Sequence, residues 1–405
     1  MHTGGVSNQF LRVATKLKSI GYRVAIIDYA DGAMGRECDL LDLSLIEYKE
    51  DSFAKVPDGS VLIMQSMTPW TIWRGLDITE NTKILFWTCH ADNFIPHVPL
   101  LSKYINKPRI GKYFFRIIFP FLYLRMQSYI KQLDKASSLI YIDAPCKSSI
   151  KNFYDLDLKE NNFVPVPVPD IKSKKSIELT NNHESKNSLN NERQISAGWV
   201  GRIAYLKYPI LLHTIKRISE ESDLMKIKVD FHVIGSGPLL TKLKSEVNKI
   251  SNMNIIFHGE LNQQKLKKII KEKVHLVFST GTSALEAASH CKPTSLLNFT
   301  HEKIVRYHKY SWLFEQDGFS VGRKITNKLS KEPDNMKLIL KEFIEDKTEL
   351  GIRSREYVLK NHSLNAVVKK LEKHIDLARF NFTELKSLKV FRPPLVYKIY
   401  KMVNF

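Results

Sequence analysis

One short segment combines residue types that suit the binding of a nucleotide: FSTGTSALEAA, residues 278–288. We predict a strand, a tight turn at Gly281, Thr282 and Ser283, and a helix. The first amides of a helix lack partners and the helix dipole is positive there, so with the two hydroxyls they form an anion site. Glu286, one turn further on, can accept hydrogen bonds from a ribose diol. The alternative role for Glu286 is to complement the helix dipole.

Two cations follow another predicted strand, in WVGRIAYLK at residues 199–207. Arg202 can hold phosphate oxygens bidentately and Lys207 can act as a point charge. Both would stabilise the negative charge that develops on a nucleoside-diphosphate leaving group. The alternative is a pair of solvated surface charges.

Glycines mark three further strand ends or helix starts. Gly235 and Gly237 lie in VIGSGP, which lacks the third glycine of a dinucleotide-binding fingerprint, so a nicotinamide or flavin site is poorly supported. Gly259 closes the next strand, and Gly5 ends a glycine loop at the start of the chain. We predict tight strand-to-helix turns at these positions.

His90 and Asp92 follow a predicted strand, KILFWT, in the first half of the chain. A histidine at a strand end can contact a substrate, and either residue can act as a base if the reaction inverts stereochemistry. The alternative is a structural histidine.

The elements that would position these groups alternate between strand and helix, which predicts an α/β fold. We expect helices at 8–20 and from 208, 239, 263 and 283, and strands at 22–28, 61–65, 84–88, 139–142, 163–168, 195–200, 228–234, 255–258, 274–279 and 294–297. The polar stretch 170–194 has too few apolar residues to order itself and predicts a linker. We therefore expect two doubly wound, Rossmann-like domains, 1–169 and 195–380, facing each other across a cleft, and a basic aromatic tail, 381–405.

The glycine loop at residues 1–5 opens the sequence, although such a loop normally follows the first strand of a doubly wound domain. We therefore expect that the first strand is missing from the sequence or lies upstream of it.

Lys and Arg exceed Asp and Glu by 62 to 42 in 405 residues, a formal charge of +20, which favours anionic partners. The cysteines are scattered, with no CxxC pair, which argues against disulfides and structural zinc and fits a reducing cytosol. We expect no metal and no cofactor. No signal peptide is recognisable, and the most apolar stretch, 113–126, is broken by Arg116, Pro120 and Arg125, so we expect no transmembrane span.

Residues 101–133 carry basic side chains, Lys112, Arg116 and Arg125 among them, interleaved with aromatic ones and without an acid before Asp134. The tail repeats this composition. Such a pattern predicts a contact with an anionic membrane surface, here the inner face of the cell membrane. The alternative is a core helix with a solvated basic face.

The ordered set of these motifs resembles the nucleotide-sugar glycosyltransferases of family 4 and their GT-B relatives. It comprises an opening Gly-Gly, Gly-Arg followed by Lys207, IGSGP, a strand that ends in His-Gly, and LEAA followed by Lys-Pro. The resemblance covers most of the chain. It implies that Arg202 and Lys207 hold the donor diphosphate, Glu286 the ribose, the segment after Gly259 the base, and Gly5 the phosphate side.

The same resemblance likens His90 to the histidine that contacts the donor sugar. It implies transfer of a sugar from a nucleotide-sugar donor. If the basic aromatic segment meets a membrane, we expect a lipid-linked or lipopolysaccharide-type acceptor in envelope polysaccharide assembly, and a cytoplasmic, peripheral enzyme. One departure is clear: Phe278 stands where the family usually has the first glutamate of its E-x7-E motif. The retaining stereochemistry that is typical of the family is therefore in doubt.

Three other hypotheses about the function remain open. A nucleotide-sugar 2-epimerase shares the GT-B plan, but more acidic and histidine residues in the cleft would be expected. A nucleic-acid-binding protein fits the charge, but the basic residues accompany bulky aliphatics and no recognition helix or RNA-binding signature is present, so we expect no nucleic-acid partner. An inactive remnant would follow from loss of the first strand.

Overall fold

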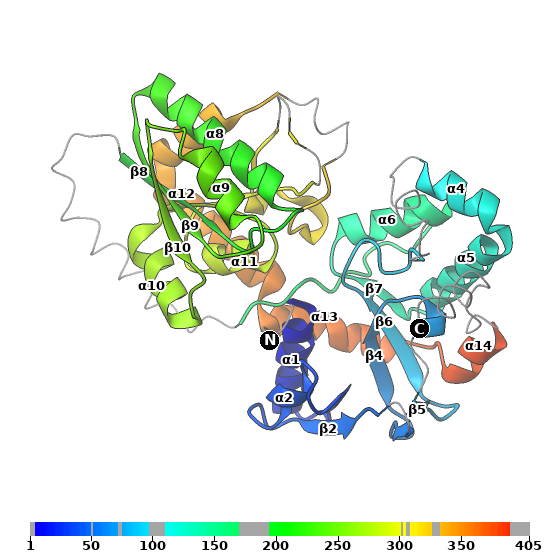
Figure 1. Cartoon of the computed structure of the whole chain (residues 1–405). Coiled ribbons are helices and arrows are strands. Elements are labelled where there is room, and N and C mark those ends of the chain that lie inside the picture. Colours follow the sequence, from blue (N-terminus) through cyan, green and yellow to red (C-terminus); the bar gives the residue numbers. More distant parts are fainter. Residues whose placement is uncertain are drawn as a thin grey trace. The chain divides into compact units, whose positions relative to one another are not determined.

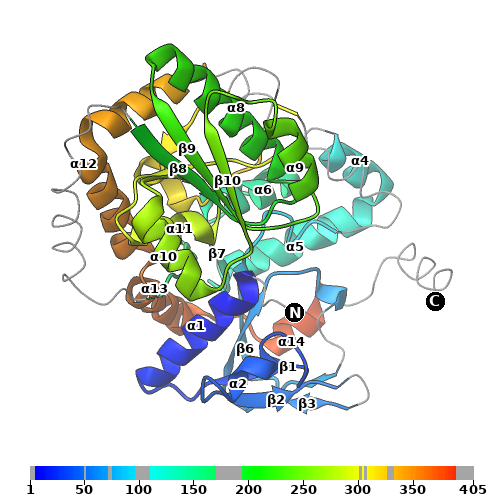
Figure 2. The same ribbon diagram turned by 60° about the vertical axis from the view of Figure 1, so that its left-hand side comes forward.

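The computed structural model describes residues 5–49, 52–71, 75–96, 110–169, 194–300, 303–304, 308–325 and 333–388. The chain forms two compact units (Figures 1 and 2). Unit 1 combines Met1–Pro167 with Leu364–Phe405, and unit 2 is the continuous segment Val168–Ser363. The chain therefore passes between the units twice.

Unit 2 contains a six-stranded sheet whose strand order reverses direction in its middle. The order is β10-β9-β8-β11-β12-β13; the first five strands are parallel and β13 is antiparallel. From β8 the chain builds outward to β9 and β10, then crosses back to β11 on the other side of β8. The strands span β8 Gln194–Val200, β9 Lys228–Ile234, β10 Asn254–Gly259, β11 Leu276–Ser279, β12 Thr294–Leu296 and β13 Ser311–Trp312.

Helices cover both faces of this sheet. One core joins Phe231 of β9 to Leu211 of α8 and Leu243 of α9. On the opposite face, Ile270 of α10 and Ala287 of α11 pack in a second cluster with Val200, Ile234, Val274 and Val277. Unit 2 is therefore doubly wound, as predicted. Its helices are α8 Tyr208–Met225, α9 Leu240–Val247, α10 Gln263–Lys273, α11 Thr282–Ser289, α12 Met336–His362 and the short η2 Leu313–Glu315 and η3 Asp317–Phe319.

Unit 1 has parallel strands in three separate sheets, where the sequence predicted one. They are β1 (Ala25–Asp28) with β2 (Ser44–Glu47), β3 (Ala54–Lys55) with β5 (Leu76–Asp77), and β4 (Val61–Gln65) with β6 (Lys83–Thr88) and β7 (Leu139–Tyr141). The predicted strand at 163–168 is wrong. Only isolated bridges form there, from Phe163 to Tyr141 and from Val168 to Ser363. Three prolines in VPVPVP remove backbone donors and explain why this extended stretch cannot form a regular ladder.

The helices of unit 1 bring the end of the chain back to its beginning. Figures 1 and 2 show α13 beside α1, with Val367, Val368 and Leu371 buried. After α13, the Ile84 amide donates to the Phe380 carbonyl. Residues 364–380 therefore belong to unit 1, although the sequence placed them in the second domain. The helices are α1 Gly5–Ser19, α2 Gly35–Cys38, η1 Pro69–Thr71, α4 Gly111–Ile118, α5 Pro120–Lys135, α6 Ala144–Tyr154, α13 Leu364–Leu377 and α14 Phe382–Ser387.

The α/β class is confirmed, because both units combine parallel strands with helices. The glycine loop before residue 5, most of the predicted linker and the tail beyond residue 388 lie outside the described residues. No helix within the described ranges is long and apolar enough to cross a membrane.

Candidate functional site

The point where the strand order of unit 2 reverses lies between β8 and β11, and the predicted motifs follow these two strands. Ser279, the last residue of β11, donates through its buried hydroxyl to the Val200 carbonyl at the end of β8, at 2.7 Å. The two carboxyl ends are therefore fixed side by side. In doubly wound sheets this switch point is where ligands bind, because the loops on either side diverge and leave room.

The loops after β8, β9 and β10 pack backbone against backbone at this edge. The Gly201 amide donates to the Ile234 carbonyl at 3.0 Å, and the Gly235 amide donates to the Gly259 carbonyl at 2.8 Å. A Cβ on Gly235 would lie 2.1 Å from the Gly201 oxygen, and one on Gly237 would lie 2.4 Å from the Ile203 oxygen. The paired glycines of VIGSGP are thus required by close packing of the loop that carries Arg202.

Helix α11 begins beside the switch point without a side-chain cap. Gly281 has a positive φ of 70°, and its amide donates to the Val321 carbonyl at 2.7 Å. The amides of Thr282 and Ser283 follow at the first helical positions, where the helix supplies no acceptor. The start of α11 therefore offers amides, hydroxyls and the positive end of a dipole, as the sequence predicted.

Lys207 occupies the N-cap position of α8, in the loop after β8. It is half-buried, and burial lowers the pKa of its ammonium group. Arg202, five residues earlier, is exposed. Within the described parts of the chain neither side chain forms an ion pair. Lys207 therefore carries a desolvated charge that no described carboxylate compensates, and an anionic ligand would supply a partner.

Glu286 lies one turn into α11 and is half-buried, so its position fits the predicted ribose contact. Phe278, at the place of the other motif glutamate, is fully buried in the core of unit 2 and packs edge-to-face on Tyr310 at 6.2 Å. It therefore cannot serve as a polar contact for a sugar.

In unit 1, His90 and Asp92 lie together in the turn that follows β6. The side chain of Asn93 accepts hydrogen bonds from the amides of Cys89 and His90, at 2.9 and 2.8 Å. The Asp92 amide donates to His90 Nδ1 at 3.2 Å. Asn93 was not predicted from the sequence; its spacing three residues after His90 was the available signal, because asparagine caps turns of this length.

Of the predicted membrane-facing cations, Lys112 on α4 is paired with Asp155. The Arg116 guanidinium lies 5.7 Å from the centre of the Tyr123 ring. Around them, α4 and α5 expose large apolar side chains, with Ile117 77% and Phe121 82% exposed. We call α4 and α5 together with these exposed side chains the α4–α5 surface. The other face of α5 buries Met126, Ile130 and Leu133, as the core-helix alternative expects, but that alternative does not account for the outward apolar residues.

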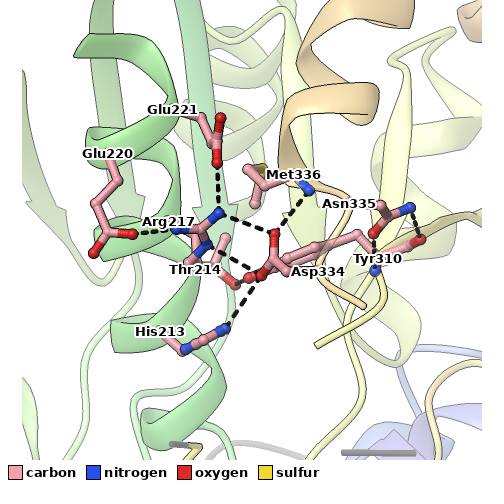
Figure 3. Close-up of polar contacts among 9 residues, drawn as sticks. All are labelled: His213, Thr214, Arg217, Glu220, Glu221, Tyr310, Asp334, Asn335 and Met336. Carbon is pink, nitrogen blue, oxygen red and sulfur yellow. Dashed lines mark hydrogen bonds and ion pairs between the residues drawn. The ribbon is translucent and has the colours of Figure 1, made fainter. Parts of the chain in front are cut away.

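A buried polar cluster that was not predicted from the sequence joins α8 to the segment before α12 (Figure 3). Arg217 Nε lies 3.1 Å from Asp334 Oδ2, and His213 Nε2 lies 3.7 Å from the same oxygen. Asn335 exchanges two hydrogen bonds with the backbone of Tyr310, at 2.7 and 2.9 Å. Because these contacts tie three segments of unit 2 together, we interpret the cluster as structural.

Gly5 is the first residue of α1, with no atom within 4 Å of a Cβ placed on it. Its predicted phosphate role stays a prediction. In the part of the chain that the structure describes, no group of three or more His, Cys, Asp and Glu side chains could hold a metal ion.

Comparisons with known proteins give fold likenesses at low identity. No family model and no curated protein matches the chain. WaaG, described as a glycosyltransferase involved in lipopolysaccharide biosynthesis, is 14% identical over 93% of this chain and 97% of its own, with a TM-score of 0.46. An OtsA apo structure is 11% identical over 80% of this chain and 74% of its own, with a TM-score of 0.45.

A structure of TarM, a protein of S. aureus, is 14% identical over 78% of this chain, with a TM-score of 0.45. The chain spans about half the length of the two TarM structures, 51% and 54%. One of them was solved with UDP and α-GlcNAc-glycerol.

Proposed function

We propose that this protein is a glycosyltransferase of the GT-B type that takes a sugar from a nucleoside-diphosphate sugar. The observation that carries the proposal is the uncompensated, half-buried Lys207 in the loop after β8, at the same switch point as the uncapped start of α11. A diphosphate provides the anionic oxygens that both features need.

In this proposal Arg202, Lys207 and the first amides of α11 bind the diphosphate. When the bond from the anomeric carbon to the β-phosphate oxygen breaks, charge accumulates on that oxygen, and these groups stabilise it without a metal. Glu286 accepts hydrogen bonds from the ribose diol, and the segment after Gly259 contacts the base. The motif resemblance to family 4 supports these assignments.

The acceptor hydroxyl attacks the anomeric carbon and loses its proton. His90 and Asp92, exposed together after β6, are the candidate groups of unit 1 for this half of the reaction. The burial of Phe278 in the core supports a sugar contact outside the usual motif, and it leaves inversion as well as retention open to experiment.

The α4–α5 surface supports a membrane-associated acceptor, lipid-linked or of lipopolysaccharide type. Its exposed apolar side chains can enter the headgroup boundary while Arg116 and Arg125 meet anionic lipid. We therefore propose a peripheral, cytoplasmic protein at the inner face of the cell membrane that acts in envelope polysaccharide synthesis.

A thermal-shift panel of nucleoside diphosphates and nucleotide sugars tests the donor site. We expect one base to raise the melting temperature, since a ligand of the folded state stabilises it. Arg202→Gln should weaken binding about tenfold or more, the loss of one charge-assisted contact, whereas Arg23→Gln, an exposed position in unit 1, should not. Equal binding by the Arg202→Gln variant and wild type would contradict the proposal.

Incubation with the donor alone distinguishes a glycosyltransferase from a nucleotide-sugar 2-epimerase, because an epimerase converts the donor without an acceptor. A glycosyltransferase should consume it only with an acceptor, apart from slow hydrolysis. Salt-sensitive DNA binding without any nucleotide effect would instead favour the nucleic-acid alternative.

A further inference from the structure

The loop after β8, residues 201–207, is fixed to its surroundings along its length. In its first half, the Trp199 indole donates to the Gly201 carbonyl at 3.0 Å. The Ile203 amide donates to the Ser236 carbonyl at 2.9 Å, and the Ile203 side chain is fully buried. This half of the loop is therefore held by the sheet and by the loop after β9.

The second half of the loop is a tight turn that leads into α8. The Lys207 amide and the following Tyr208 amide both donate to the Ala204 carbonyl at 2.9 Å. From the loop after β12, the Thr300 amide donates to the Leu206 carbonyl at 3.0 Å. The turn is therefore held by the start of α8 and by a second loop at the same edge of the sheet.

Tyr205 lies within this turn, and its side chain is 66% exposed. A single exposed aromatic residue is common on protein surfaces, so exposure alone assigns it no function. Its place is more informative, because Tyr205 stands between Arg202 and Lys207, the two cations that we propose for the diphosphate. A backbone that is already fixed presents such a side chain to a ligand at little entropic cost.

The donor sugar needs a contact at this edge of unit 2, because the motif position that usually provides one is apolar. Phe278 is fully buried in the core and cannot reach a sugar. In the sheet, Phe278 of β11 pairs with Trp199 of β8, and β8 leads directly into the loop that carries Tyr205. The neighbouring strand therefore brings a different side chain to the place where the motif lacks its glutamate.

The chemistry of tyrosine suits a sugar. A pyranose ring has faces made of C–H groups, which pack on the apolar face of an aromatic ring, while the phenol hydroxyl can bond to a sugar hydroxyl. In the proposed function, Glu286 and the segment after Gly259 contact the nucleoside, and Arg202 and Lys207 contact the diphosphate. The transferred sugar is the part of the donor that has no contact in unit 2 among these assignments.

We propose that Tyr205 is a specificity-determining residue whose ring packs against the transferred sugar of the donor. It takes the place of the glutamate that Phe278 replaces. The ring gains contact from the C–H face of the sugar, whereas a carboxylate would bind the sugar hydroxyls. This inference rests on the proposed function, because it requires a nucleotide sugar at the switch point of unit 2.

Calorimetric titration of the full-length protein without an acceptor tests the inference. The probes are pairs of a nucleotide sugar and its nucleoside diphosphate, UDP-glucose with UDP and GDP-mannose with GDP, and the pair that binds the wild type more tightly is used. Tyr205→Ala should weaken binding of the nucleotide sugar about threefold to tenfold, the range of one aromatic contact, and leave binding of the nucleoside diphosphate unchanged. Tyr205→Phe keeps the ring and should keep most of the affinity.

Phe53→Ala, at a 75% exposed position in unit 1, is the matched control and should change neither affinity. All three variants should unfold at the temperature of the wild type, because the replaced side chains are exposed.

The outcomes separate this inference from the proposed function. If the wild type binds the nucleotide sugar and Tyr205→Ala binds it equally well, the inference alone is wrong. Equal weakening of both members of the pair would assign the ring to the nucleotide or to the integrity of the loop, and a loss in Tyr205→Phe as large as in Tyr205→Ala would assign the contact to the hydroxyl. Either result would overturn the stacking contact. If the wild type binds no member of either pair and none of the thermal-shift panel, the proposed function fails and the inference fails with it.

Discussion

Lys207 shows how a single residue can reveal a binding site through what it lacks. Its ammonium group loses hydration without gaining a carboxylate partner among the described residues, and burial lowers its pKa. Uncompensated buried charges destabilise a fold. A residue that lowers stability and makes no compensating contact within the described chain is expected to bind a ligand. This property distinguishes Lys207 from a solvated surface cation, the alternative interpretation.

We therefore predict that Lys207→Met weakens nucleoside-diphosphate binding about tenfold to a hundredfold, the loss of one charge-assisted contact. The free energy of unfolding of the ligand-free protein should stay the same or rise, because a desolvated charge is removed. Calorimetric titration and urea unfolding measure the two effects. Lys337→Met, at an exposed position on α12, is the matched control and should change neither. Loss of stability together with loss of binding would assign Lys207 a structural role.

His308 supplies a second test at the residue scale, through pH. It is 3% exposed, and burial together with the neighbouring His213 lowers its pKa to about 4. In the unfolded chain its pKa is about 6.5. Below that pH the unfolded state binds the proton more readily, so stability should fall as the pH drops from about 6.5 to 4, by up to about 3 kcal/mol from this residue.

His308→Phe should reduce that loss. Urea unfolding of the wild type and the variant at pH 7.5 and 5.0 measures it, and the difference in stability between the two pH values should shrink in the variant. If both proteins lose the same stability on acidification, the prediction that His308 is buried in its neutral form is wrong.

The sequence identified the residues of the switch point because a nucleotide site needs side chains next to strand ends, and strand ends can be read from short apolar runs. Asn93 was not predicted, although its spacing after His90 and Cys89 is local and was the available signal. The Arg217–Asp334 pair gives no local signal, because the two residues are 117 positions apart in the chain. Such a contact depends on tertiary structure.

At the scale of elements, the loops after β8 and β9 depend on glycine for a reason other than ligand contact. Gly235→Ala would bring a Cβ to 2.1 Å from the Gly201 oxygen at a φ of 131°. We predict a loss of about 3 kcal/mol or more, from the steric overlap and the strained backbone. Gly259→Ala has a φ of 67° but nothing within 4 Å, and it should lose only about 1–2 kcal/mol. Urea unfolding followed by tryptophan fluorescence compares them, and equal losses would show that the loops separate easily.

The α4–α5 surface is the element that would reach a membrane. Ile117→Ser with Phe121→Ser should weaken binding to anionic phospholipid vesicles about tenfold or more, because two exposed apolar side chains can no longer be buried. Thermal stability should not change. Leu40→Ser with Leu224→Ser, two exposed leucines elsewhere, is the control. Vesicle sedimentation measures binding, and wild-type affinity in the α4–α5 variant, or equal binding to neutral vesicles, would remove this surface from the proposal.

Elements were predictable where their apolar pattern is regular. The strands at 61–65 and 228–234 occur at their predicted bounds, and α10 begins at its predicted residue. The predicted strand at 163–168 was wrong, because its apolar residues are buried without forming a regular hydrogen-bonded ladder with another strand. The division of unit 1 into separate sheets was also not predictable, because strand propensity does not state which strands pair.

At the scale of the whole molecule, unit 1 is discontinuous and unit 2 is not. Residues 364–388 complete unit 1, because α13 packs on α1. The Phe380 amide donates to the buried Ser138 hydroxyl at 3.1 Å, and the Phe380 carbonyl accepts from the Ile84 amide. The sequence predicted that the tail returns to the first domain, but it placed the return after residue 380. The amphipathic pattern of a helix does not indicate which unit it packs against. Helices α12 and α13 belong to different units although only Ser363 separates them.

We therefore predict that ending the chain after Ser363 disrupts unit 1 and spares unit 2. Hydrogen exchange measured by mass spectrometry should show β6 and α1 losing protection, because buried Val367, Leu371 and Phe380 are removed from their core. Peptides from β8 and β11 should exchange as in the full chain, and nucleoside-diphosphate binding should persist, because Lys207 and α11 belong to the continuous unit. A chain that ends after Ser387 retains α13 and Phe380 and serves as the control. Loss of protection in both units would mean that they fold as one cooperative body, and loss of nucleotide binding with β8 and β11 still protected would place part of the donor site in unit 1.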